Sequence, residues 1–199
     1  MEKRAEPYVQ EAEVYFRQGN LVAAKESLRM AVAEDPADVD LTLALGNTCL
    51  RLGDTESACA EFRAATLANP RSALAQVSLA ACLFMEERYA ESESSARRAL
   101  ALEPGNGEAL KVVGMSCLKV GRLNEGVQAY AEAVWRNPKD VDALSALSEC
   151  YAQVGDLDSA TLLFEKALEA EPGNLYASAR LEQLRRPLSV GPDSAGEAA

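Results

Sequence analysis

Apolar residues recur along the chain with the period of an amphipathic helix, in segments that each end at a short break. The segment ACLFMEER, residues 81–88, contains one of these breaks. In a helix, Cys82 and Leu83 point towards a helix–helix core, Phe84 and Met85 occupy another face, and residues 86–88 form an exit turn. The pattern predicts a series of short helices, each with an apolar side to bury.

The breaks between the predicted helices follow a period of 34 residues. Proline cannot continue a helix and keeps the preceding residue out of the helical conformation, so each proline of the series marks a helix end and a turn. The prolines of the series are Pro36, Pro70, Pro104, Pro138 and Pro172. A second break lies within each unit, so each unit is predicted to contain two helices.

The second break is a glycine in four of the five units. These glycines are Gly19, Gly53, Gly121 and Gly155. Glycine after a helix adopts the left-handed conformation at little cost. In the third unit Glu87 takes this position, and a non-glycine residue in that conformation costs about 1 kcal/mol. We therefore expect a slightly strained or differently shaped turn at Glu87.

Residues at fixed positions of the unit resemble the signature of the tetratricopeptide repeat, which places Leu-Gly, Tyr, Ala, Phe, Ala and Pro at set positions. The second unit carries Leu45, Gly46, Ala58, Phe62, Ala65 and Pro70. The fifth unit carries Leu147, Tyr151, Ala160, Phe164, Ala167 and Pro172. The resemblance implies an all-α fold, a right-handed superhelical α-solenoid of helix-turn-helix repeats.

The same period divides the chain. The predicted repeats span residues 5–38, 39–72, 73–106, 107–140 and 141–174. A further helix at 175–186 is expected to cap the array, with Tyr176 and Leu181 packed on the fifth repeat and Arg180 and Arg186 facing water. Residues 187–199 are rich in small residues, proline and glycine, so we expect a disordered tail there.

The chain is strongly acidic, with 31 Asp and Glu against 20 Lys and Arg and a net charge of −11. Such a surface repels phosphate backbones and anionic lipids, so nucleic acid is not an expected partner. No apolar run reaches about 18 residues, and the first residues lack the apolar core of an export signal. We therefore expect no direct membrane insertion and a cytoplasmic location.

Chemistry-bearing motifs are missing from the sequence. Histidine, the commonest general base and metal ligand, does not occur, and the five cysteines form no CxxC pair. A glycine-rich phosphate loop, GxSxG and HExxH are also missing. The sequence predicts a non-catalytic protein with free thiols and without a bound metal or cofactor. Trp135, late in a second helix, is assigned to packing.

In the family that the chain resembles, the first helix of each repeat lines the concave face. Counting at helical spacing, the middle three repeats place a nearly continuous apolar strip there, bordered by cations. The predicted partner-binding residues are Leu43, Asn47, Leu50, Arg51, Val77, Phe84, Met85, Lys111, Val112, Met115, Leu118 and Lys119. The strip favours docking of an extended or helical peptide segment of a protein partner. Packing between neighbouring repeats would use the same apolar residues, and the sequence leaves both interpretations open.

Two ligand-binding types known in that family do not fit. A carboxylate clamp needs Lys where Leu43 stands and Asn where Ser78 stands, and an asparagine ladder fails at Ala44, Ser78 and Val112. The prediction is therefore a scaffold or adaptor for protein–protein interaction. Self-assembly into a homo-oligomeric scaffold stays open as an alternative, and so does an accessory or chaperone role in a secretion or pilus-type assembly.

Overall fold

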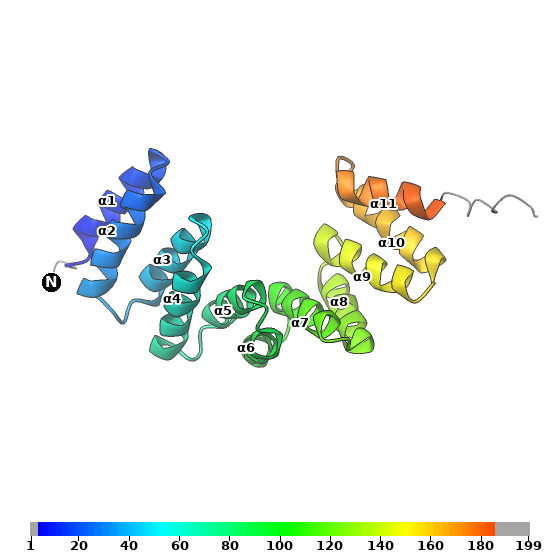
Figure 1. Ribbon diagram of the computed structural model, residues 1–199, viewed down its shortest axis with the longest axis horizontal. Coiled ribbons are helices and arrows are strands. Elements are labelled where there is room, and N and C mark those ends of the chain that lie inside the picture. Colours follow the sequence, from blue (N-terminus) through cyan, green and yellow to red (C-terminus); the bar gives the residue numbers. More distant parts are fainter. Residues whose placement is uncertain (1–3, 186–199) are drawn as a thin grey trace, which may run out of the picture. The chain divides into compact units, whose positions relative to one another are not determined.

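The computed structural model describes residues 4–185, and every regular element in that range is an α-helix (Figure 1). The helices are α1 (Glu6–Arg17), α2 (Leu21–Glu34), α3 (Val39–Arg51), α4 (Thr55–Ala68), α5 (Ala73–Met85), α6 (Tyr89–Leu102), α7 (Gly107–Lys119), α8 (Leu123–Arg136), α9 (Val141–Gln153), α10 (Leu157–Ala170) and α11 (Leu175–Arg185). The predicted all-α fold is confirmed for this part of the chain. Arg186 and the predicted tail at 187–199 lie outside the described residues.

The helices form two compact units, each described by itself. Unit 1, Met1–Arg136, holds α1 to α8, and unit 2, Asn137–Ala199, holds α9 to α11. In unit 1 the helices pair in chain order, and each second helix also contacts the first helix of the following pair (Figure 1). The helices α3, α5 and α7 begin at Val39, Ala73 and Gly107, which is the 34-residue period of the sequence.

The turns inside the helix pairs have the predicted left-handed residue. Gly19, Gly53, Gly121 and Gly155 have φ angles between 73° and 82°. Glu87 is the one non-glycine residue with positive φ among residues 4–185, at 61°. Glycine costs nothing there, whereas a side chain is strained by about 1 kcal/mol. The expected strained turn at Glu87 is therefore present.

The two helices of a pair approach closely where a small residue faces a ring. A Cβ atom added to Gly46 would lie 2.6 Å from Cε1 of Phe62, and one added to Gly114 would lie 2.7 Å from Cε2 of Tyr130. In the third repeat the same positions hold Ala80 and Ala96, both fully buried. In the second and fourth repeats a larger residue on one helix therefore matches a smaller residue on the other, which keeps the interior close-packed.

Unit 2 ends with α11 packed on α10. Ala177 and Leu181 are buried, and the Tyr176 ring meets the Phe164 ring edge-on at 6.2 Å between centroids. The expectation that Arg180 faces water was wrong, because its Nε and Nη2 donate to the Glu149 carboxylate at 2.5 and 2.6 Å. Tyr176 donates to the same carboxylate at 2.8 Å. The last described helix is thus fixed by an ion pair as well as by apolar contacts.

An inter-repeat ion pair joins α2 to the N-terminus of α4. Lys25 Nζ donates to Asp54 Oδ2 at 2.7 Å, and Oδ1 of Asp54 accepts the backbone N–H of Ser57 as the cap of α4. The hydrogen bond from Lys25, followed by those from Ser57, lowers the pKa of Asp54 from 3.8 to about 2. The folded state therefore holds the ionised carboxylate more strongly than the unfolded chain does.

Acid is expected to remove the contribution of Asp54. Because its pKa is lowered on folding, the contribution is complete above pH 3.8 and is lost as the pH falls towards 2. Asp54→Asn keeps a capping oxygen but loses the charge, so its stability curve should converge with that of the native chain across this window. Urea unfolding at steps of pH measures the difference. The matched control is Asp156→Asn, which removes an N-cap carboxylate with a lowered pKa but no lysine partner.

Candidate partner-binding surface

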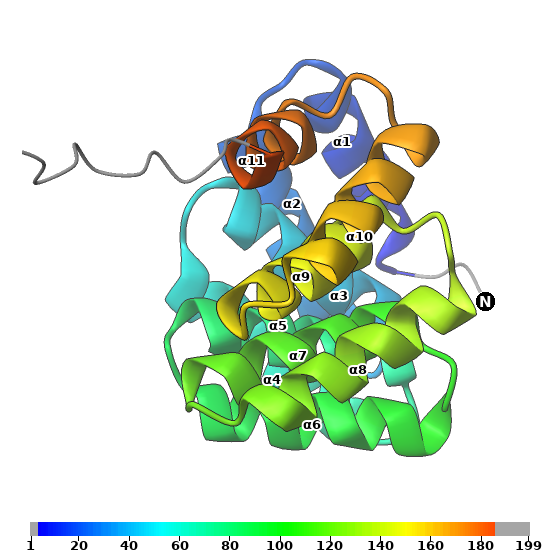
Figure 2. The same cartoon turned by 90° about the vertical axis from the view of Figure 1, so that its right-hand side faces the viewer.

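The helices α3, α5 and α7 lie one after another in unit 1, and α5 contacts both of the others (Figure 2). Because these helices are one repeat apart, residues 34 positions apart lie at corresponding levels. The exposed residues of these helices are called the first-helix surface: Asp40, Asn47, Arg51, Leu74, Met85, Glu108 and Lys119. This surface is the side of unit 1 on which the sequence predicted partner contacts.

The predicted residues differ widely in their exposure. Asn47, Arg51, Met85 and Lys119 are exposed. Leu50, Val77, Phe84, Lys111, Met115 and Leu118 are half-buried. Leu43 and Val112 are buried, each in an apolar core cluster. Their packing accounts fully for these two residues in the free protein, and their contact with a partner stays a prediction.

Several half-buried residues have partners inside unit 1. The Phe84 ring lies 5.3 Å from the Tyr89 ring, at the start of α6. Leu118 packs towards α8, where its Cδ2 would lie 2.7 Å from a Cβ added to Gly126. Met115 packs against a core cluster. These contacts leave Met85, which is 58% exposed, as the main apolar member of the predicted set that reaches solvent.

Leu74 belongs to this surface although the predicted set omitted it. It is 60% exposed, in the first turn of α5, while Met85 ends the same helix. The signal was present in the sequence, because Leu74 occupies the repeat position of Asp40 and Glu108. The predicted set followed a continuous apolar strip and left Leu74 out, because the equivalent residues of α3 and α7 are acidic.

The charges of the first-helix surface are sorted by level. Asp40 and Glu108, in the first turns of α3 and α7, occupy the same repeat position as Leu74. Arg51 and Lys119, in the last turns of the same helices, occupy the same repeat position as Met85. The surface therefore has one acidic end and one basic end, with an exposed apolar side chain of α5 at each.

Two of the cations are already engaged. The Arg51 guanidinium lies 5.6 Å from the centroid of the Phe16 ring, so it bridges α3 to α1. Lys111 Nζ lies 2.8 Å from Glu108 Oε1, and the Lys111 side chain is only 13% exposed. Lys111 thus serves mainly inside the unit, whereas Arg51 still has an exposed side chain.

Comparison with known protein families shows which family the chain belongs to. Family models described as "Tetratricopeptide repeat" match residues 9–65, 43–107 and 117–184. The chain belongs to the tetratricopeptide repeat (TPR) family. TPR proteins generally mediate protein–protein interaction.

Solved TPR structures share the fold. MamA from Desulfovibrio magneticus RS-1 is 21% identical and superimposes with a TM-score of 0.77, covering 87% of this chain and 98% of that one. YrrB, described as a TPR protein with an unusual peptide-binding site, is 21% identical with a TM-score of 0.69, covering 90% and 93%. Likeness at this level of identity establishes the fold.

A curated relative is the general transcriptional corepressor trfA of Dictyostelium discoideum. It is 26% identical over 129 residues, which is 64% of this chain. The matched region is only 9% of the relative's length. The likeness thus concerns one short stretch of a much longer protein.

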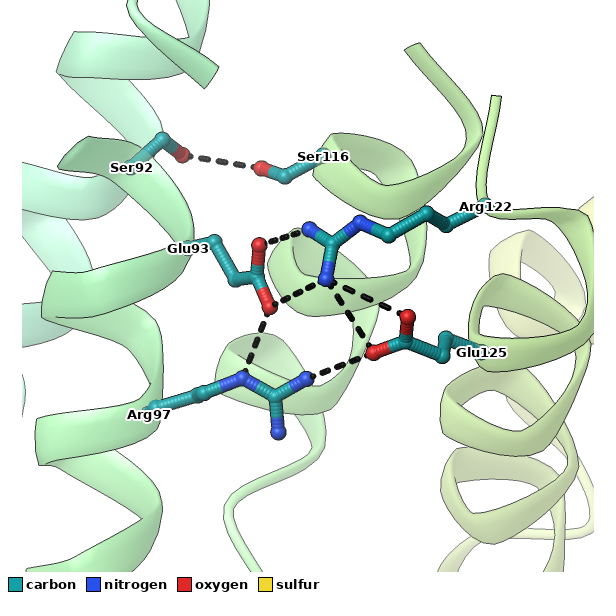
Figure 3. Close-up of polar contacts among 6 residues, drawn as sticks. All are labelled: Ser92, Glu93, Arg97, Ser116, Arg122 and Glu125. Carbon is teal, nitrogen blue, oxygen red and sulfur yellow. Dashed lines mark hydrogen bonds and ion pairs between the residues drawn. The ribbon is translucent and has the colours of Figure 1, made fainter. Parts of the chain in front are cut away.

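A network of ion pairs joins the third and fourth TPR repeats (Figure 3). The Glu93 carboxylate accepts from Arg97 Nε at 2.8 Å and from Arg122, and Glu125 accepts from Arg97 at 3.3 Å and from Arg122 at 3.1 Å. Hydrogen bonding from Arg122 lowers the pKa of Glu93. Beside the network, Ser116 donates to Ser92 at 3.1 Å between buried hydroxyls.

The network includes a possible set of metal ligands. Ligand atoms of Glu93, Cys117 and Glu125 lie within 4.8 Å of one another. The two carboxylates are already neutralised by Arg97 and Arg122, and burial raises the pKa of the Cys117 thiol. A cation would have to displace both guanidinium groups. The arrangement therefore fits a structural junction between TPR repeats.

Two clefts of unit 1 lie away from the predicted partner-binding residues. One, of about 360 Å³, is lined by α4 and the α5–α6 turn and includes Cys59, Arg63 and Arg88. Another, of about 270 Å³, lies between α4 and α6, with Leu79 and Leu83 among its lining. Arg63 pairs with Glu91 at 3.8 Å between them. Both clefts are built mainly from second helices of the TPR repeats.

The assignment of Trp135 to packing was wrong. Trp135 is 69% exposed, and the Arg136 guanidinium lies 4.7 Å from the centroid of its ring. The reason is positional, because Trp135 occupies the repeat position of Leu67, which is 77% exposed on α4. Residue type suggested burial, whereas the position in the TPR repeat decides exposure.

No helix among residues 4–185 combines the length and apolar character that a bilayer crossing needs.

Proposed function

We propose that the chain is a non-catalytic adaptor whose first-helix surface binds an extended or helical segment of a protein partner. One observation carries the proposal: Leu74 and Met85 are exposed at the two ends of α5. The neighbouring first helices carry acidic residues at the level of Leu74 and basic residues at the level of Met85. Exposed apolar side chains gain free energy when a partner covers them. Charged residues at the rim select the partner and its direction.

The surface limits the shape of that segment. Leu74 and Met85 are eleven positions apart in one helix, which is about 17 Å at about 1.5 Å per residue. This length suits about three turns of a partner helix, or about five residues of an extended strand. The expected segment has an apolar face, with basic residues near Asp40 and Glu108 and acidic residues near Arg51 and Lys119.

The same residues also serve their own helices. Acidic groups in the first turn and basic groups in the last turn stabilise a helix through its dipole, by about 0.3–1 kcal/mol each. The dipole explains the sorting of charge along α3 and α7. It does not explain why α5, between them, exposes leucine and methionine at the same two levels. Partner binding accounts for both the sorted charges and the exposed apolar side chains.

A second candidate is self-assembly, and the charge pattern favours it directly. A surface with one acidic and one basic end complements a second copy of itself turned by 180°, as a two-fold interface requires. Arg51 and Lys119 of one copy would then meet Asp40 and Glu108 of the other. The net charge of −11 opposes such pairing at low salt.

We expect Leu74→Glu combined with Met85→Glu to reduce partner capture by about tenfold or more, because each apolar contact is worth about 1.5–3 kcal/mol. The measurement is affinity capture from the native cell, quantified by mass spectrometry, with circular dichroism as the check on folding. Leu67→Glu is the matched control, because Leu67 is 77% exposed on α4, outside the first-helix surface.

Two further measurements separate the candidates. Light scattering over a hundredfold range of concentration should give a constant monomer mass if the partner is another protein, and a rising mass if the surface pairs with itself. Arg51→Glu combined with Lys119→Glu should weaken capture and reduce its dependence on salt. Unchanged capture by the folded Leu74→Glu/Met85→Glu variant would contradict the adaptor, and a mass that rises as much for this variant as for the native chain would contradict self-assembly through this surface.

A further inference from the structure

Two cysteines from neighbouring repeats lie side by side in unit 1. Cys82 Sγ of α5 lies 3.4 Å from the carbonyl oxygen of Thr55, which is one helical turn before Cys59 in α4. Both cysteines belong to the same core cluster. The pKa of each thiol responds to the other, and that of Cys82 also responds to Cys49, which belongs to the same cluster. The fold thus brings together two thiols that are 23 positions apart in the sequence.

One member of the pair lines a cleft, although its side chain is only 5% exposed. Cys59 is part of the lining of the cleft of about 360 Å³ beside α4, together with Arg63 and Arg88. Cys82 is fully buried behind it. Cys117 and Cys150 are buried as well, and no other thiol is among the groups that shift the pKa of either. Cys59 is therefore the entry point of a dithiol, with Cys82 positioned to act second.

We propose that Cys59 and Cys82 are a reversible oxidation site, at which a low-molecular-weight disulfide converts the two thiols into a disulfide bond between α4 and α5. This inference stands independently of partner binding. It names a modification and its co-reactant, and it makes the junction between the second and third repeats sensitive to the redox state.

The reaction balances as two thiol–disulfide exchanges. Cys59 loses a proton and attacks one sulfur of the reagent RSSR, which forms a mixed disulfide and releases one RSH. Cys82 then loses its proton and attacks the Cys59 sulfur, which forms the Cys59–Cys82 bond and releases the second RSH. The protein is oxidised by two electrons, RSSR is reduced to two RSH, and both protons leave on the released thiols.

Burial sets the rate and the order of these steps. It raises the pKa of both thiols, so each is almost wholly protonated near pH 7. The thiolate is the attacking form, so exchange should be slow, on a scale of minutes to hours. The second step is intramolecular and should follow quickly, so the mixed disulfide at Cys59 should not accumulate.

The bond would join two helices that hold the centre of unit 1. It would close a loop between residues 59 and 82, and a loop of this size restricts the unfolded chain. We expect the unfolding temperature of unit 1 to rise by an amount on the order of 5–10 °C. Reduction should reverse the change.

The experiment treats the full chain with bis(2-hydroxyethyl) disulfide, a small neutral reagent, and maps peptides without reduction by mass spectrometry. The expected result is a cross-linked peptide pair containing Cys59 and Cys82, with a rise in unfolding temperature that dithiothreitol reverses. Cys59→Ala and Cys82→Ala should each abolish the rise. Cys150→Ala, a buried cysteine of unit 2, should retain it.

Two outcomes would overturn the proposal. One is a stable mixed disulfide on Cys59 without the internal bond. This result would show that the sulfur atoms of Cys59 and Cys82 lie too far apart to bond. The other is no loss of either thiol in the folded chain under conditions in which the urea-unfolded chain reacts fully. If the alanine variants fold poorly, the peptide map of the native chain still decides between these results.

Discussion

Phe62→Ala is expected to lower the free energy of unfolding of the native chain by about 3–5 kcal/mol, the usual range for a fully buried phenylalanine. The Phe62 side chain is completely buried between α3 and α4 and belongs to the main core cluster of unit 1. Its removal leaves a cavity, and Gly46, which faces the ring, has no side chain to fill it. Urea unfolding followed by circular dichroism measures the loss.

The third repeat supplies the design of a rescue. There the corresponding positions hold Ala80 and Ala96, so a pair of alanines fits the same helix–helix contact. Gly46→Ala alone should destabilise the chain by about 1–3 kcal/mol, because the new methyl group meets the ring. In the Phe62→Ala background the same change should stabilise by about 0.5–1 kcal/mol, through helix propensity and partial filling of the cavity.

Leu67→Ala is the control for this prediction. Leu67 lies on the same helix but is 77% exposed, so its truncation should change stability by less than about 0.5 kcal/mol. A loss for Phe62→Ala no greater than that for Leu67→Ala would show that the ring does not hold α3 and α4 together. An additive double variant would show that Gly46 and Phe62 do not interact.

Glu93→Lys is expected to destabilise unit 1 by about 2–4 kcal/mol. The Glu93 side chain is 12% exposed and holds two guanidinium groups, those of Arg97 and Arg122 (Figure 3). A lysine there would place a third cation between them in a region of low exposure. Removing one partner of a buried pair costs about 3–5 kcal/mol, and the partial exposure of both arginines reduces that figure.

The chain itself contains the reversed version of this contact. Glu93 and Arg122 occupy the repeat positions of Lys25 and Asp54, two repeats earlier, where the same kind of junction has its charges exchanged. Adding Arg122→Asp to Glu93→Lys should therefore recover half or more of the lost stability. A double-mutant cycle measures the coupling.

Glu91→Lys is the matched comparison, because Glu91 also pairs with arginines but its side chain is 53% exposed. Its effect on stability should be much smaller than that of Glu93→Lys, because solvent screens an exposed ion pair. If Glu91→Lys and Glu93→Lys cost the same, burial of the network would contribute nothing. If the double variant were no better than Glu93→Lys alone, the two junctions would not be equivalent.

The exposure of apolar residues on the first helices shows where helical periodicity reaches its limit. Leu43 and Leu74 both lie on first helices, at positions that helical spacing turns away from the core of their own pair. Leu43 is buried in a core cluster, whereas Leu74 is 60% exposed. Periodicity gives the direction of a side chain from its own helix axis, but the neighbouring helix determines whether that direction ends in protein or in water.

The sequence by itself determined the helices, the turns and the repeat. Local chemistry suffices for these, because proline ends a helix wherever it stands and Gly19, Gly53 and their equivalents favour a left-handed turn without help from distant residues. Even the strained turn at Glu87 followed from the missing glycine, and its φ of 61° agrees.

Only the tertiary structure decided which side chains from different repeats meet. The reversed ion pairs at Lys25–Asp54 and Glu93–Arg122, and the contact of Cys82 with the Thr55 carbonyl of α4, depend on how one helix pair packs on the next. The angle and separation of that packing come from many apolar contacts summed over two helices. No single residue or spacing carries this information, so it appears only once the repeats are stacked.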